Sequence, residues 1–308
     1  WLEMVSSFTT TGLIITNLEI FSGSALRLWF GMVSWIGGIF FWICAISILL
    51  PLNISRFGVG ANDLVDHSSI KGYANVNSFL SNSRHLIPIY LIITIFLWLL
   101  LTLSGVSGFQ ALLMAMSVIS TSGFDVMNND VPNVFIIEGI ILIFFVFALS
   151  KSLFFRDINE IRNFRIFNDP EIRLALIIIL VVTGLFYVKF LFALLSDNTD
   201  INIFVLLTQL WGIFFTVTSY LVTMGIESKV WFDLPSFALA EVSTVSVMGL
   251  AIIGGGVATT AGGVKLLRVY ILYRNAAQEV DMMLHPNSIP SKKGKGSISD
   301  NRNNRLMA

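Results

Sequence analysis

The feature that most constrains this chain is a short phrase that occurs three times, about a hundred residues apart. In each copy a Ser lies six residues before a Gly, a Thr lies two residues before it, and an apolar residue follows it. The copies occupy residues 6–13, 117–124 and 219–226. The spacing is longer than the unit of a solenoid repeat. We therefore interpret the chain as one larger module used three times.

The composition indicates where such modules reside. Hydrophobic residues make up 55% of the 308 positions, charged residues make up 12%, and the mean hydropathy is +0.81. Soluble domains carry roughly 25% charged residues. The single cysteine, Cys44, lies in an apolar run and excludes a disulfide framework or a cysteine zinc site. The fold class predicted is an all-α polytopic membrane protein.

Apolar stretches divide the chain into spans and shorter segments. A crossing of the ~30 Å hydrocarbon core needs about 20 helical residues. Stretches of that order occur at 26–52, 87–103, 131–155, 172–195 and 232–253. Residues 109–119 are apolar but too few to cross, which predicts a half-helix that enters and returns, and 203–222 is interpreted as another short helix with its phrase. The predicted unit is span, short re-entrant helix, phrase, span.

The distribution of basic residues predicts the orientation. The links 53–86, 151–173 and 265–308 contain 16 of the 19 Lys and Arg residues, and the positive-inside rule assigns those links to the cytoplasm. The three phrases then face outward. Each is followed by acidic residues, namely Glu19, Asp125, Asp130, Glu227 and Asp233.

This pattern favours a cation pathway. Irregular backbone at membrane depth is tolerated where it lines a water-filled path, and its carbonyl oxygens can replace the hydration shell of an ion. Glycine reaches backbone angles that other residues avoid, and the C-terminal ends of short helices favour positive charge. The predicted filter consists of Thr10, Thr11, Gly12, Thr121, Ser122, Gly123, Thr223, Met224 and Gly225. One Thr-Gly phrase alone would indicate no more than a turn.

A glycine-rich stretch, residues 254–263, interrupts the last apolar span. It superficially suggests a phosphate-binding loop, but it lacks the Gly-Lys-Ser/Thr ending and continues a membrane span. Close helix packing is the simplest alternative interpretation of so many glycines.

These motifs resemble the potassium uptake proteins of the TrkH, KtrB and HKT type. The resemblance rests on Phe8-Thr-Thr-Thr-Gly12, Trp35-Ile-Gly-Gly38, Ser120-Thr-Ser-Gly-Phe124 and Ile253-Gly-Gly-Gly-Val-Ala-Thr-Thr-Ala-Gly-Gly-Val-Lys265. Ala45–Pro51 and His285-Pro286 also fit. The match runs over nearly the whole chain, and the glycine-rich break is its most specific part.

The resemblance implies a fold of four span-pore-span repeats and transport of K⁺, since Gly12 stands where some Na⁺-transporting plant members have Ser. It implies that the break gates the filter from beneath, through Gly254, Gly255, Gly256, Thr259, Thr260, Gly262, Gly263 and Lys265. It also implies a homodimer in the cell membrane with a cytoplasmic nucleotide-binding regulatory subunit. No cofactor other than the transported K⁺ is expected, and no nucleic acid.

The predicted organisation is incomplete relative to that family. Residues 1–55 correspond to a pore loop and second span, 56–165 to a second repeat, 166–275 to a third with a broken last helix, and 276–308 to a link. The third phrase, Val222-Thr-Met-Gly225, has fewer hydroxyls than usual, and the linker from it to Gly254 is long. We expect a fourth repeat in a longer chain, or supplied by another polypeptide.

Individual charged residues allow two interpretations each. Glu138 and Glu241 near outer helix ends are predicted to be interfacial, and Asp125 is either functional or a solvated loop charge. Lys265 and Arg268 fit the positive-inside bias or help to close the gate.

An enzyme is not predicted. His67, His85 and His285 all fall in predicted cytoplasmic links, and no paired carboxylates occur inside a span. Two alternatives to passive uptake remain: a K⁺ symporter coupled to H⁺ or Na⁺, and the ion-conducting subunit of an ATP-driven K⁺ pump.

Overall fold

The computed structural model describes residues 1–12, 24–45, 47, 76–124, 133–149, 170–196, 203–229, 236–256 and 259–284. Those residues form helices, with no strand among them. The helices are α1 (Leu2–Phe8), α2 (Ser24–Cys44), α4 (Val76–Leu103), α5 (Gly108–Ser120), α6 (Val134–Leu149), α7 (Pro170–Ser196), α8 (Ile203–Leu221), α10 (Ser236–Ile253) and α11 (Leu266–Leu284).

Four segments of the described chain are long and apolar enough to cross a membrane. They are Ser24–Cys44 of α2, Leu86–Leu103 of α4, Ile172–Phe192 of α7 and Ile203–Leu221 of α8. Many of their large apolar side chains remain exposed, as suits helices that meet lipid. The predicted all-α polytopic fold is confirmed.

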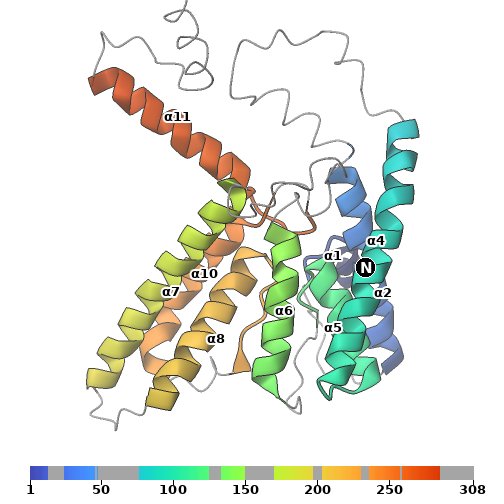
Figure 1. Ribbon diagram of the computed structural model, residues 1–308, viewed down its shortest axis with the longest axis horizontal. Coiled ribbons are helices and arrows are strands. Elements are labelled where there is room, and N and C mark those ends of the chain that lie inside the picture. Colours follow the sequence, from blue (N-terminus) through green and yellow to red (C-terminus); the bar gives the residue numbers. More distant parts are fainter. Residues whose placement is uncertain are drawn as a thin grey trace, which may run out of the picture.

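The helices repeat one packing arrangement (Figure 1). Helix α5 packs against α4 and α6, its neighbours in the chain, and against α2 of the preceding module. Helix α8 in the same way packs against α7 and α10, and against α6 of the preceding module. Helix α1 packs against α2. The module inferred from the sequence is thus also a packing unit, and α5 and α8 each join two modules.

Close backbone approach seats α1 and α5 against α2. A Cβ added to Gly37 would overlap the carbonyl oxygen of Phe8 and lie 3.1 Å from its Cα. One added to Gly38 would lie 3.0 Å from the Cα of Ser120. Only a residue without a side chain lets helices pass at this distance. The Gly-Gly pair of α2 therefore determines how α1 and α5 sit against it.

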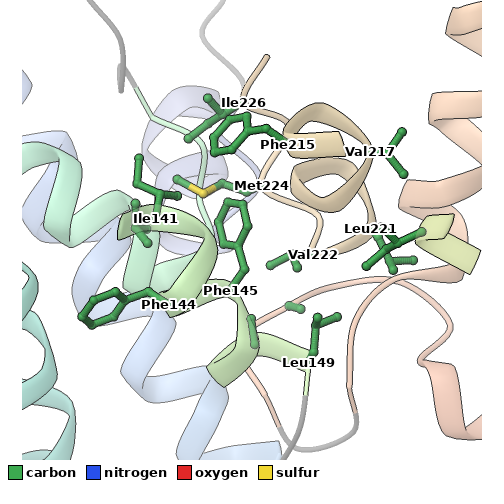
Figure 2. Packing of buried hydrophobic residues seen from close by; sticks show 14 of the residues in the cluster. Ile141, Phe144, Phe145, Leu149, Phe215, Val217, Leu221, Val222, Met224 and Ile226 are labelled. Carbon is green, nitrogen blue, oxygen red and sulfur yellow. The ribbon is translucent and has the colours of Figure 1, made fainter. Parts of the chain in front are cut away.

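The main hydrophobic core lies where α6 meets α8 and the third phrase. Phe145 of α6 and Phe215 of α8 are fully buried, with ring centroids 6.0 Å apart. Figure 2 shows Val222 and Met224 of the third phrase beside Phe145. The third phrase is therefore supported from behind by packed aromatic and aliphatic side chains.

Two helices extend beyond the predicted apolar stretches, and one predicted helix length was wrong. Helix α4 begins at Val76, inside the predicted polar link, and α11 continues to Leu284, inside the predicted polar tail. Helix α8 has 19 residues, long enough to cross the membrane, whereas a short helix was predicted. Hydropathy locates the hydrocarbon core, but a helix continues beyond the core as long as its backbone hydrogen bonds are maintained.

Candidate functional site

The three phrases share one backbone structure at the ends of α1, α5 and α8. In the second copy the N–H of Thr121 donates to the carbonyl of Val118 (3.2 Å), and that of Ser122 donates to Ser117 (3.1 Å). This pair of bonds is the Schellman motif that ends many helices. The first copy repeats it with Thr10 to Ser7 and Thr11 to Ser6, and the third with Thr223 to Tyr220 and Met224 to Ser219. The recurring Ser is therefore the residue whose carbonyl closes the cap.

The backbone angles repeat as well. The threonines have φ of 57°, 54° and 62°, in the left-handed region, and the glycines two positions later have φ of 69°, 66° and 72°. The residue between them is not left-handed in any copy. Such alternation can bring successive carbonyl groups to one side of the chain, as an ion-coordinating strand requires. A β-branched residue in the left-handed region is strained, which is typical of functional sites.

Successive phrases touch one another in the same way. A Cβ on Gly12 would overlap the carbonyl oxygen of Ser122 and lie 3.2 Å from its carbonyl carbon. A Cβ on Gly123 would overlap the carbonyl oxygen of Met224, again with its carbon at 3.2 Å. Gly12 and Gly123 thus each face the residue before the glycine of the next phrase. The predicted filter residues of three modules therefore form one continuous cluster.

Gly225 has a different environment. Its Cβ position meets only the ring of Tyr220, at 3.8 Å, among the described residues, and Gly225 itself is exposed. In the first two phrases the glycine contacts the following phrase. By the same order, the open side of Gly225 is where a further phrase would lie.

The predicted gate is a loop whose two ends are joined. The N–H of Val264 donates to Ile252 (2.8 Å), and that of Lys265 donates to Ile253 (3.0 Å). Gly254 and Gly263, at φ of 73° and 81°, pack so closely that a Cβ on Gly263 would lie 2.5 Å from the Cα of Gly254. The stretch therefore leaves the α10 axis and returns to the same place, as an inserted loop.

The loop contacts both the bundle and the predicted filter. The N–H of Gly256 donates to the carbonyl of Ala148 at the end of α6 (3.2 Å). The N–H of Gly262 donates to the side-chain oxygen of Thr223 (2.7 Å). Lys265, at φ of 81°, directs its amine back to the carbonyl of Ala261. The predicted gate is thus hydrogen-bonded directly to the third phrase.

A small cavity of ≈ 30 Å³ adjoins the loop. Thr259 and Thr260 of the loop line it together with Trp42, Tyr90 and Phe144. The Thr259 hydroxyl donates to the carbonyl of Gly256 (2.8 Å), so this side chain stabilises the loop rather than facing a ligand.

A polar network supports the third phrase from behind. The N–H of Ile226 donates to the Ser219 hydroxyl (2.8 Å), and the N–H of Ser228 donates to the Thr216 hydroxyl (3.2 Å). The indole of Trp211 donates to Glu138 (2.8 Å), whose carboxylate also lies beside Ser228 and Lys229. Side chains of α8 and α6 thus determine the path of the chain after Gly225.

Glu138 lies in an environment that the sequence did not predict. It was predicted to be interfacial, but it is fully buried, because its position on α6 faces α8 and the segment after the third phrase. An ionisable group buried in a membrane bundle costs free energy and is generally functional. A single Glu in an apolar span is the sequence signal for it.

Some predicted residues cannot be placed. Asp125, His67 and His285 lie outside the described residues, and so do the side chains of Glu241 and His85. In the part of the chain that is described, no group of three or more His, Cys, Asp or Glu side chains could hold a metal ion.

Comparison with known proteins gives a consistent family signal. No family model matches the chain. An uncharacterized cation transporter of Methanocaldococcus jannaschii is 28% identical over 292 residues, 93% of this chain and 54% of that protein. The Trk system potassium uptake protein TrkH of Halomonas elongata is 25% identical over 310 residues, 97% of this chain and 60% of that protein.

The fold agrees with these relatives. The crystal structure of the potassium transporter TrkH from Vibrio parahaemolyticus superposes with a TM-score of 0.72 at 21% identity, covering 96% of this chain and 58% of that one. The chain thus spans between half and two thirds of the length of the relatives it matches. The predicted resemblance is confirmed: the chain is similar in sequence to Trk system potassium uptake proteins over nearly all of its own length, and its fold is that of the TrkH structure.

Proposed function

We propose that this chain forms part of a pathway for K⁺ uptake across the cell membrane, with the three phrases as filter strands and residues 254–263 as the gate. The observation that carries the proposal is the repeated contact between phrases, Gly12 against Ser122 and Gly123 against Met224. Three identical caps joined in sequence order favour carbonyl groups arranged around a shared axis. Relatives named as potassium uptake proteins support K⁺ as the ion.

A fourth phrase beside Gly225 would complete the ring. The open position at that glycine and the repeated order of contacts support this arrangement. The fourth phrase would come from the same polypeptide at full length or from another chain.

The filter phrases are proposed to face outward. The N-terminal ends of α4 and α7, with Arg84 and Arg173, lie at the same end of the bundle as α11, with Arg268 and Arg274 (Figure 1). The positive-inside rule assigns that end to the cytoplasm. The homodimer and the nucleotide-binding regulatory subunit are proposed from the family resemblance alone.

The test is ion flux through the full-length protein in liposomes. With an imposed K⁺ gradient and no H⁺ or Na⁺ gradient, we expect K⁺ uptake that exceeds Na⁺ uptake. Uptake that appears only with an H⁺ or Na⁺ gradient would favour the coupled symporter. Liposomes with correctly inserted protein and no K⁺ flux under either condition would refute the proposal.

A further inference from the structure

We propose that the Thr223 hydroxyl anchors the 254–263 loop to the third filter phrase, so that loop position and phrase conformation are coupled. This inference rests on the proposed function for its meaning in transport. The bond itself, from the Gly262 N–H to Thr223 Oγ1 at 2.7 Å, joins residues 39 positions apart in the sequence. A Cβ on Gly262 would lie 3.3 Å from the same oxygen, so the loop is seated closely on the phrase.

The cap at the end of α8 does not need this hydroxyl. Thr121 has the same place in the second copy, with the same Schellman bonds and a similar φ. Its hydroxyl donates to the carbonyl of its own neighbour, Ser120, at 2.7 Å. The backbone structure is therefore the same whether the hydroxyl bonds locally or reaches another segment. In the third copy the hydroxyl is used as the acceptor for the loop.

Threonine at position 223 strains the backbone. Position C′ of a Schellman motif is usually Gly, because Gly has no Cβ to hinder the left-handed conformation. Thr223 holds φ of 62° despite its branched Cβ. Thr10 and Thr121 have the same conformation, and residues in sparsely populated backbone regions cluster at functional sites. The bond to Gly262 is the contact that distinguishes the Thr223 side chain from that of Thr121.

The anchor is distinct from the bonds that close the loop. The base is held by backbone bonds between residues 264–266 and residues 252–255, and Gly256 is held by Ala148. Loss of the Thr223 hydroxyl would leave all of those bonds in place. It would release the loop from the phrase without opening the loop at its base.

The expected consequence is reciprocal coupling. The loop has two positions in this proposal, one bonded to Thr223 and one released. A change in the phrase as ions enter or leave then shifts the equilibrium between these two positions. By linkage, release of the loop changes the affinity of the phrase for ions by the same factor. A net hydrogen bond shifts such an equilibrium by roughly 2- to 12-fold.

The experiment uses the full-length protein in liposomes, in a cysteine-free background with Thr260→Cys as a reporter on the loop. The rate of labelling by a small water-soluble thiol reagent is measured with and without K⁺, and K⁺ flux is measured in parallel. We expect Thr223→Val to speed labelling by roughly 2- to 12-fold and to raise flux. Thr223→Ser, which retains the hydroxyl, should restore slow labelling.

Thr121→Val is the matched control, because it removes the corresponding hydroxyl from a phrase that does not contact the loop through it. Its labelling rate should equal that of the parent protein, whatever its flux. Gly262→Ala approaches the same bond from the loop side and should also speed labelling. Equal labelling of Thr223→Val, Gly262→Ala and Thr121→Val would overturn the anchor.

The labelling comparison without K⁺ does not depend on transport. Faster labelling of Thr223→Val without any K⁺ flux in the parent protein would therefore support the anchor while refuting the proposed function. K⁺ flux in the parent protein, together with a Thr223→Val labelling rate equal to that of the parent protein, would support the proposed function and refute the anchor.

Discussion

Gly12 lies directly against the carbonyl group of Ser122, so closely that a Cβ would overlap the oxygen. These residues belong to two different modules, 110 positions apart. The same relationship joins Gly123 to Met224. At Gly12 and Gly123 the absence of a side chain thus has two uses: it permits the left-handed backbone, and it permits contact with the next phrase.

Substitution at this contact should alter ion selectivity. Gly12→Ser adds a side chain where Ser122 already lies and forces one of the two phrases to move. We expect a lower K⁺ to Na⁺ permeability ratio, measured by flux in liposomes. Gly184→Ala on α7, where a Cβ meets nothing within 4 Å, is the control and should retain the ratio. An unchanged ratio in Gly12→Ser would contradict the filter assignment.

Deletion of residues 254–263 should raise K⁺ flux if the loop gates the pathway. The ends of the loop are already adjacent, since Val264 bonds to Ile252 and Lys265 bonds to Ile253. The helix on either side can therefore be joined with little rearrangement. Uptake of K⁺ into liposomes measures the result, with membrane insertion verified separately. A fall in flux with normal insertion would count against a gate.

The Gly37 contact should be essential to stability. Gly37→Ala places a methyl group on the carbonyl of Phe8, and we expect thermal unfolding in detergent at a lower temperature, with a loss of about 1–3 kcal/mol. Gly249→Ala on α10 is the matched control, because its Cβ position is open. That substitution should be neutral or stabilising by up to ~1 kcal/mol, from helix propensity. Equal effects would show that the α1–α2 contact is unimportant.

Glu138 and Trp211 should be energetically coupled. Trp211→Phe removes one hydrogen bond from the fully buried Glu138 carboxylate, and Glu138→Ala leaves the half-buried Trp211 indole without that acceptor, at a cost of ~1–3 kcal/mol. We expect Glu138→Ala, Trp211→Phe and the double variant to yield a coupling free energy of about 0.5–3 kcal/mol from thermal unfolding. Glu138→Gln, which retains an acceptor, should lose less than Glu138→Ala. Additive single effects would mean that the bond contributes nothing.

The sequence alone was sufficient for the local features. Recurring Ser, Thr and Gly predicted three equivalent phrases, because a helix cap depends on residues within six positions of each other. Apolar stretches predicted an all-α membrane fold, because burial in lipid requires long apolar helices. The glycine-rich break was equally evident. Helix ends were less predictable, as the start of α4 at Val76 and the end of α11 at Leu284 demonstrate.

Only the tertiary structure decided which distant residues meet. Three relationships depend on helix packing between residues 39 to 110 positions apart: Gly12 against Ser122, Gly262 against Thr223, and Glu138 against Trp211. No local pattern distinguishes Thr223 from Thr121, although one bonds to the loop and the other to its neighbour. A hydroxyl or carboxylate takes whichever partner the packed helices bring within reach, and that choice depends on interhelical geometry rather than on adjacent residues.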